Sequence, residues 1–141
     1  MKTSSLLIAL VLITAATASA GWVSEVVASN GDVGNYCSVL VDHWSRPHVA
    51  YFDKSNSLVV YARYNGTSWT LETVATGVKL AGNISLAFDS TERPYIAFWD
   101  STSKDLKYCS KSGTTWTAEA VANGNGYGLV TSLAITGRQI G

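Results

Sequence analysis

The sequence predicts an all-β protein built from copies of a four-stranded unit, and three observations support this prediction. Trp22, Trp69 and Trp116 are separated by the same interval of 47 residues. The chain between them is rich in Val, Thr, Tyr, Ser and Trp and shows no helical periodicity. Short apolar runs alternate with turns that contain Gly, Asn, Asp and Ser. A fixed period of roughly 40–50 residues made of short strands is typical of β-propeller blades.

The repeat holds over two periods without an insertion or a deletion. Glu25 matches Glu72 and Glu119 at the same interval, and so do many other residues, among them Ser38/Ser85/Ser132, Asp42/Asp89, Arg46/Arg93, Pro47/Pro94, Asp53/Asp100 and Tyr61/Tyr108. Agreement at this many positions predicts that each period is one structural unit.

Residues 1–20 are predicted to be a signal peptide. Lys2 supplies a positive charge, residues 6–13 are apolar, and Ala18-Ser19-Ala20 fits the small-residue cleavage rule. The apolar run is short for a membrane span, although an uncleaved anchor is the alternative. We therefore expect a secreted or periplasmic protein that starts at Gly21 and has no membrane partner after cleavage.

The mature chain, 21–141, is predicted to be an incomplete propeller. We expect a lone outer strand at 21–28, one blade at 36–76, a second blade at 83–122 and the start of a further blade at 129–136. The blade strands are expected at 36–42, 47–53, 58–64, 69–76, 83–89, 94–100, 106–110 and 116–122. Closed propellers typically have about 4–8 blades. We therefore expect the chain to be a fragment, a truncated reading frame or a piece that closes by forming a homo-oligomer, and we expect its partner to be the missing remainder or a further copy.

One set of motifs resembles a known group of proteins. The pattern W-x-x-E-x-V, S-L-x-x-D, R-P-x-[IV]-A-[FY] and G-x-[ST]-W is similar to the blade repeats of secreted sialidase-like propellers. Gly66 to Trp69 and Gly113 to Trp116 match the second half of their Asp-box, S-x-D-x-G-x-T-W. Tyr64 and Lys111 stand where that motif has Asp. The resemblance implies the fold, whereas the sialidase catalytic residues come from many blades and cannot all lie in this chain.

Composition and motifs limit the function. The formal net charge is zero and charged residues make up 14%, which argues against a nucleic-acid partner. No motif predicts a catalytic residue, a metal site or a cofactor. The carboxylates of Asp42, Asp89, Asp53 and Asp100 recur in each unit and so share an environment, whereas an acid–base pair needs two different environments. We therefore expect these aspartates to be structural, and we expect Trp22, Trp69 and Trp116 to pack between blades.

Residues outside the repeat are the candidates for ligand binding. His43 and His48 flank a turn, and the aligned residues in the next unit are Ser90 and Tyr95. Two histidines beside an aspartate are too few for a tight metal site. Trp44 lies in the same turn and is the best candidate for an exposed aromatic platform, with ordinary loop packing as the alternative. Cys37 and Cys109 lie outside the repeat plan, and we expect no disulfide between them.

These observations favour a non-catalytic binding or scaffolding module with a glycan or a protein as ligand. The alternative is a fragment of a sialidase-like glycoside hydrolase whose catalytic residues lie outside this chain. Regular blades throughout the whole protein would favour binding, and Asp-box aspartates with a non-repeated arginine trio would favour the enzyme.

Overall fold

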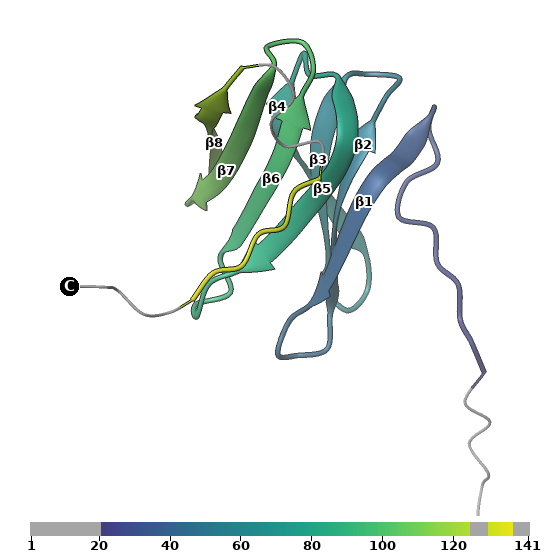
Figure 1. The fold of residues 1–141 in the computed structure, drawn as a ribbon. Helices are drawn as coiled ribbons and strands as arrows, with labels where there is room; N and C mark the ends of the chain where they lie inside the picture. Colours follow the sequence, from purple (N-terminus) through teal and green to yellow (C-terminus); the bar gives the residue numbers. More distant parts are fainter. Residues whose placement is uncertain (1–20, 125–129, 137–141) are drawn as a thin grey trace, which may run out of the picture.

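A computed structural model describes residues 21–124 and 130–136 and contains two four-stranded antiparallel sheets (Figure 1). The first sheet has the order β1 (Val33–Val41), β2 (Pro47–Asp53), β3 (Leu58–Tyr64) and β4 (Trp69–Thr76). The second sheet has the order β5 (Leu80–Phe88), β6 (Pro94–Asp100), β7 (Asp105–Ser112) and β8 (Thr115–Asn123). No helix occurs in the described residues. The prediction of an all-β chain with repeated four-stranded units is confirmed, and the two sheets are not closed into a ring.

The strand boundaries agree with the repeat, except at the first strand of each sheet. Strands β2, β3, β4 and β6 have the expected limits, and β7 and β8 are slightly longer than expected. Strands β1 and β5 start earlier because each begins with an irregular segment, in which the pairing register shifts near Gly34 and Gly82. Both glycines have positive φ values, 86° and 147°, which permit this irregular backbone.

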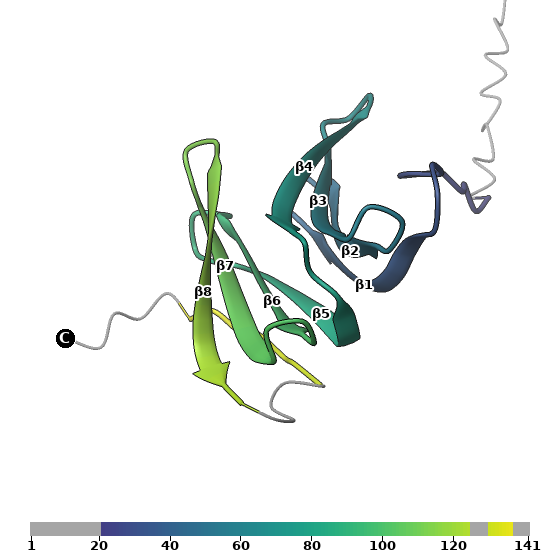
Figure 2. The same cartoon turned by 90° about the horizontal axis from the view of Figure 1, so that it is seen from above.

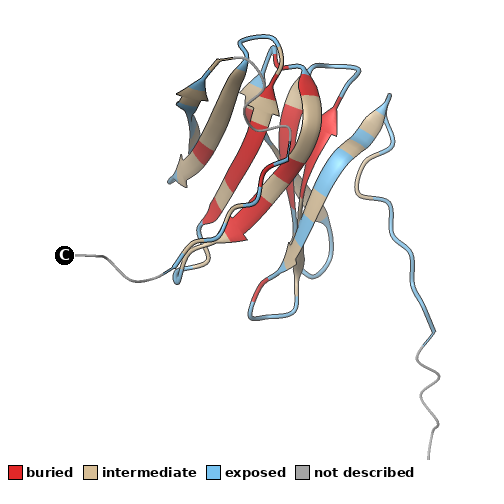
Figure 3. Cartoon of the chain, viewed as in Figure 1, coloured by how far each residue is buried: buried red, intermediate tan, exposed pale blue. Residues whose placement is uncertain are grey.

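The two sheets pack face to face around one apolar core (Figures 2 and 3). Strands β1 and β2 contact β5, and β4 contacts β8. Side chains alternate between the faces of a strand, so every second residue of β2 and β3 points toward the second sheet. The buried residues of this core include Ala50, Phe52, Val59, Tyr61, Ile84, Leu86, Ile96, Phe98 and Cys109.

A hydrogen bond between the sheets follows the sequence repeat. The hydroxyl of Ser38 accepts from the backbone N–H of Leu86 at 3.2 Å. One repeat later, the hydroxyl of Ser85 accepts from the N–H of Leu133 at 2.9 Å. Residues 130–136 therefore lie against the second sheet much as β5 lies against the first. No strand is assigned there, although one was expected over 129–136, and residue 129 lies outside the described residues.

Residues 21–28 also differ from the expectation, because they form no strand. Both third strands in the described residues, β3 and β7, already pair on each side, so neither offers this segment a free edge. Val27 and Ala28 instead pack on a small cluster on the outer face of the first sheet, formed by Tyr51, Val60 and Ala62.

The three repeated tryptophans have three different environments. Only Trp116 packs between the sheets. Trp69 packs on the outer face of the first sheet and Trp22 is fully exposed, so the expected packing between two sheets is seen at Trp116 and not at the other two positions. The predicted signal peptide, 1–20, lies outside the described residues. Among the described residues, no helix is long and apolar enough to cross a membrane.

Candidate binding site

The turn between β1 and β2 is shaped by the carboxylate of Asp42. Its Oδ1 atom accepts the backbone N–H groups of Trp44 at 3.0 Å and Arg46 at 2.8 Å. Ser45 has a φ of 62°, in the left-handed region, and the N–H of Asp42 closes the turn on the carbonyl of Arg46. An aspartate at the end of a strand forms such local bonds readily. The side chain of Trp44 is thereby directed by a well-fixed backbone.

The equivalent turn between β5 and β6 is built in the same way. Oδ1 of Asp89 accepts the N–H groups of Thr91 at 2.8 Å and Arg93 at 3.0 Å, and Glu92 takes the left-handed conformation with a φ of 61°. Hydrogen bonds from Thr91 lower the pKa of Asp89 to about 2, although burial opposes the shift. The repeated aspartate thus has a structural position in each sheet.

The second repeated aspartate is the last residue of the second strand of each sheet, Asp53 in β2 and Asp100 in β6. The carboxylate of Asp53 accepts from the backbone and side chain of Asn56. Asp100 accepts the N–H groups of Lys79 and Thr102, and its Oδ2 atom lies 2.7 Å from Nζ of Lys107. Burial raises the pKa of Asp100, but the bonds from Lys107 and the backbone outweigh it and the pKa falls to about 2.

A chain of polar side chains runs inward from the first turn. Nε of Arg46 donates to Oδ2 of Asp42 at 2.7 Å, and Nε2 of His48 lies 3.3 Å from the same oxygen. Nδ1 of His48 lies 2.5 Å from the hydroxyl of Tyr61. Since a carboxylate only accepts, both contacts of a neutral His48 are satisfied when Nε2 carries the proton and Nδ1 accepts from Tyr61.

Burial and hydrogen bonding together determine the charge states of His48, Asp42 and Tyr61. Burial lowers the pKa of His48, and the nearby carboxylate of Asp42 offsets the effect only in part. Burial would raise the pKa of Asp42, but hydrogen bonds from the side chain and backbone of Arg46 and from His48 hold that pKa well below its usual range. Burial also raises the pKa of Tyr61. At neutral pH the inner wall of the site is thus a neutral imidazole beside a carboxylate paired with Arg46.

The second sheet supplies the facing wall. Oε1 of Glu92 accepts the backbone N–H of His43 at 2.7 Å and lies 2.5 Å from Nδ1 of the same histidine. Nζ of Lys111 lies 2.6 Å from Oε2 of Glu72 on the first sheet, and Nε1 of Trp116 donates to the same carboxylate at 3.0 Å. These contacts join the two sheets on both sides of an open space.

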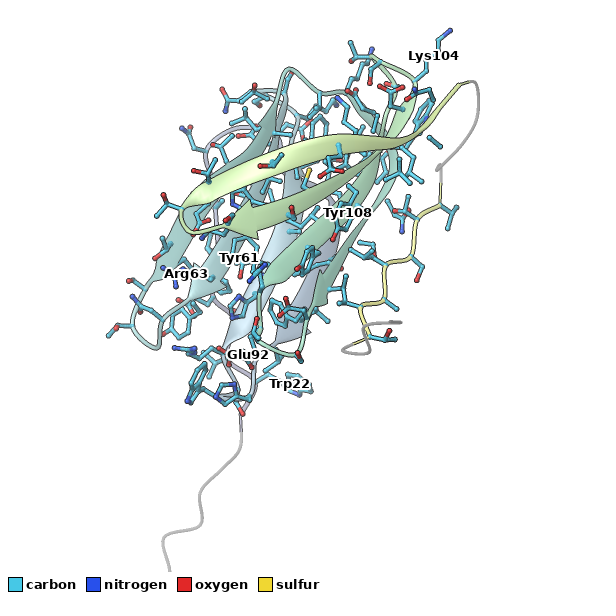
Figure 4. The ribbon with its side chains drawn as sticks, turned by 90° about the vertical axis from the view of Figure 1, so that its left-hand side faces the viewer. Trp22, Tyr61, Arg63, Glu92, Lys104 and Tyr108 are labelled. Carbon is cyan, nitrogen blue, oxygen red and sulfur yellow. The ribbon has the colours of Figure 1, made fainter. Side chains whose placement is uncertain are left out.

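That space is a polar hollow of about 270 Å³ at one end of the sheets. The first sheet and its turn contribute Asp42, Trp44, Arg46, His48, Tyr61 and Arg63, and the second sheet contributes Thr91, Glu92, Pro94 and Lys111. In Figure 4 the lining residues Tyr61, Arg63 and Glu92 lie toward the end opposite Lys104. We call this space the inter-sheet hollow.

Two of the three candidate residues named from the sequence, Trp44 and His48, line the inter-sheet hollow. His48 forms part of its buried wall, and Trp44 lies at its rim with 61% of its surface exposed. The guanidinium carbon of Arg46 lies 4.3 Å from the centre of the Trp44 ring. The ring of His43 contacts that of Trp44, with the ring centres 3.3 Å apart, but His43 does not line the hollow.

Sequence reasoning missed the rest of the lining. Arg46 and Tyr61 had been noted only as positions of the repeat, shared with Arg93 and Tyr108. Arg63, Glu92 and Lys111 were not considered for binding, because two of them come from the other sheet and reach the hollow only through the packing of the sheets. Lys111 was the one of these residues that the sequence marked as unusual, because it stands where the Asp-box pattern has aspartate.

The described residues contain no group of three His, Cys, Asp or Glu side chains that could hold a metal ion. Cys109 is buried in the core between the sheets, whereas Cys37 is exposed and lines a space on the far side of the first sheet. The inter-sheet hollow therefore offers hydrogen-bond donors, paired charges and one exposed indole. Comparison with protein-family models, with curated proteins and with solved structures finds no match for this chain.

Proposed function

We propose that the chain is a binding module that takes a glycan into the inter-sheet hollow and does no chemistry on it. The observation that carries this proposal is the exposed ring of Trp44 at the rim of a polar hollow. Aromatic rings supply a large apolar surface with one specific geometry. Convergent polar groups beside such a surface are what fixes the orientation of a small ligand.

The size of the inter-sheet hollow favours a small ligand group. Small-molecule sites typically enclose about 300–1,000 Å³, and a volume of about 270 Å³ lies just below that range. A single sugar unit at the end of a chain suits this space better than an extended oligosaccharide. Arg63 is well placed to donate to its hydroxyl groups, because its distance of 3.7 Å from Glu72 is too long for a tight pair.

The carboxylates of the site support binding in preference to hydrolysis. A glycosidase needs one carboxyl group with a raised pKa as general acid. Hydrogen bonds from Arg46 keep the pKa of Asp42 low against its burial, and the backbone N–H of His43 lowers the pKa of Glu92. Both groups are thus held as ionised hydrogen-bond acceptors. The alternative, a fragment of a sialidase-like hydrolase, places its catalytic residues outside this chain, and no observation on the described residues favours it.

We further propose that the two sheets are blades of a β-propeller in an exported protein. The interval of 47 residues, the four antiparallel strands per unit and the repeated Ser38–Leu86 and Ser85–Leu133 bonds support this architecture. The predicted signal peptide supports export. Sequencing the N-terminus of protein released from expressing cells tests the export proposal: Gly21 as the first residue supports it, and an intact Met1 overturns it.

A glycan array tests the binding proposal, with the protein compared against two tryptophan variants. Trp44→Ala removes the exposed ring from the rim, and Trp22→Ala removes a fully exposed ring that does not line the hollow. We expect a restricted set of glycans to bind the parent and Trp22→Ala proteins, and at least tenfold weaker binding by Trp44→Ala. An array without signal, or equal binding by all three proteins, contradicts the proposal.

A further inference from the structure

The contact between the two sheets joins two complementary faces. Trp116 of the second sheet packs edge-on against Tyr61 of the first, with ring centres 5.4 Å apart. Its Nε1–H donates to Glu72 on β4 at 3.0 Å. The first sheet therefore presents a tyrosine and a glutamate, and the second sheet inserts a tryptophan between them.

The sequence repeat places equivalents of both faces on the outer sides of the two sheets. No further sheet packs against these outer sides in the described residues. Trp69 holds the position of Trp116, on the outer face of the first sheet. Tyr108 and Glu119 hold the positions of Tyr61 and Glu72, and both belong to the second sheet. Tyr108 lines a hollow on that sheet's outer face, and the side chain of Glu119 is exposed.

The indole of Trp69 is the sharpest sign that a partner belongs there. Its Nε1 atom is buried and, like that of Trp99, has no hydrogen-bond partner among the described residues, but only Trp69 occupies a repeat position whose counterpart has an acceptor. A buried N–H without an acceptor costs about 1–3 kcal/mol and is rare in native proteins. Trp116, at the same repeat position, has its acceptor in Glu72. Glu25 holds the equivalent glutamate position for Trp69, but its side chain is exposed.

Both outer faces are covered incompletely. On the first sheet, the segment around Val27 and Ala28 leaves a hollow of about 240 Å³, lined largely by apolar residues that include Val49 and Tyr51. On the second sheet, residues 130–133 leave a hollow of about 460 Å³, lined by residues that include Ala97, Tyr108 and Val121. Interiors that pack fully have few spaces of this size.

We propose that the partner is a second copy of this chain, whose first sheet docks on the outer face of the second sheet and repeats the internal contact. Trp69 of one copy then packs beside Tyr108 of the other and donates Nε1–H to Glu119. Both halves of the interface are present on one chain, so every copy offers one donor face and one acceptor face. Such head-to-tail contacts form a ring when the rotation closes. Two sheets per copy and about 4–8 sheets per closed propeller give two to four copies.

Docking displaces two segments: the one around Val27 and Ala28 leaves the outer face of the first sheet, and 131–136 leaves the second sheet. The N–H of Leu133 reaches Ser85 as the N–H of Leu86 reaches Ser38, so the segment 131–136 occupies the place of an incoming first strand. Val39 of the second copy holds the repeat position of Leu86 and brings its N–H to the same hydroxyl of Ser85. The bonds between Asn83 and Thr131 are lost in the exchange.

The docked copy also builds a second hollow at the junction. The repeat identifies the residues that would line it. One copy contributes Asp89, Arg93, Tyr95 and Tyr108. The second copy contributes Trp44 and Tyr64, which hold the repeat positions of Thr91 and Lys111. Tyr95 and Tyr108 are already stacked, with ring centres 5.6 Å apart. This junction has more aromatic residues than the inter-sheet hollow within one chain.

Light scattering of the protein expressed from the full sequence and purified in its exported form tests the proposal. We expect a mass of two to four chains. Val121→Glu places a charge on the proposed face, where Val121 is 64% exposed and outside the core, and should give a folded monomer. Thr114→Glu adds the same charge in the exposed turn between β7 and β8 and should keep the parent mass.

A second variant, Glu119→Lys, tests the proposed hydrogen bond and should raise the dissociation constant of the oligomer at least tenfold. Far-UV circular dichroism and a cooperative unfolding transition check that each variant is folded. A parent protein that stays monomeric at micromolar concentrations overturns the proposal. An oligomer of unchanged mass and affinity in both Val121→Glu and Glu119→Lys overturns it as well.

Discussion

The hydroxyl of Ser38 accepts the backbone N–H of Leu86 at 3.2 Å and joins the first strand of one sheet to the first strand of the next. Ser85 and Leu133 repeat this contact at 2.9 Å. The relation is informative because a serine repeated at a fixed interval satisfies a backbone group of the following unit. The sequence repeat is therefore also a repeat of the contacts between units.

Ser38→Ala should destabilise the protein more than Ser85→Ala. Leu86 is buried, so loss of the Ser38 hydroxyl leaves its N–H without a partner, at a cost of about 1–3 kcal/mol. Ser85 bonds only to the segment 130–136, which forms no strand. Urea unfolding in the Val121→Glu background, where we expect monomers, measures both free energies. Equal losses of unfolding free energy in the two variants would contradict a larger contribution of the Ser38–Leu86 bond to stability.

Glu72→Gln should weaken the contact between the sheets, whereas Glu119→Gln should not. Glu72 accepts from Lys111 at 2.8 Å and from Trp116 at 3.0 Å, and Glu119 holds the same repeat position but is exposed. We expect a loss of about 1–3 kcal/mol for Glu72→Gln, since hydrogen bonds to charged groups are the stronger ones. We expect less than about 0.5 kcal/mol for Glu119→Gln. The comparison uses the same monomeric background and the same unfolding assay, and a loss that is not larger for Glu72→Gln contradicts the assignment.

Stability should fall as the pH falls below the ordinary pKa of histidine, and His48 should account for part of the decrease. Burial lowers the pKa of His48 below the ordinary histidine value of 6.5, so the unfolded chain binds a proton at a pH where the folded chain does not. Stability then rises with pH across that window and is complete above it. The titratable or charged side chains around His48 are Asp42, Arg46, Tyr61 and Arg63.

The matched variant for this pH dependence is His48→Gln, which keeps hydrogen-bonding groups but does not titrate. His43 is present in both proteins, so the difference between their curves isolates His48. We expect the free energy of unfolding of the parent to decrease more than that of the variant between pH 7 and pH 5. Curves that run parallel over this range would contradict the buried, neutral state of His48.

The two cysteines should differ in reactivity. Cys37 is exposed, whereas Cys109 is completely buried and its pKa is raised by burial to about 12. Since the thiolate is the reactive form, we expect a thiol reagent to modify Cys37 in the folded protein and Cys109 only after unfolding. Mass spectrometry of the reagent-treated protein, with and without denaturant, gives the result. Rapid modification of Cys109 in the folded protein would contradict the packing of the core.

Much of the fold could be predicted from the sequence, because local signals agree with the repeat. Pro47 and Pro94 mark the starts of β2 and β6, where a missing N–H does least harm. The early starts of β1 and β5 could not be predicted, since Gly34 and Gly82 look like turn residues although both lie within strands. The placement of 21–28 depends on which strand edges are free, and no local pattern carries that information.

The candidate site could be predicted only in part. His48 and Trp44 stood out because they break the repeat, and both line the inter-sheet hollow. Glu92 and Lys111 reach the same hollow from the second sheet, through contacts between residues far apart in the chain. Reading one unit at a time does not show which side chains of the next unit face it.

The most direct test of the central claim, that a glycan enters the inter-sheet hollow, is an NMR titration of labelled protein with a panel of free monosaccharides. The indole N–H of Trp44 and the side-chain signals of His48 and Arg63 report on three sides of the hollow. The account predicts that at least one sugar shifts these signals in a saturable way and leaves the indole N–H of Trp22 unchanged. If every sugar leaves the hollow's signals unchanged, or if all shifts lie elsewhere on the sheets, the claim is contradicted.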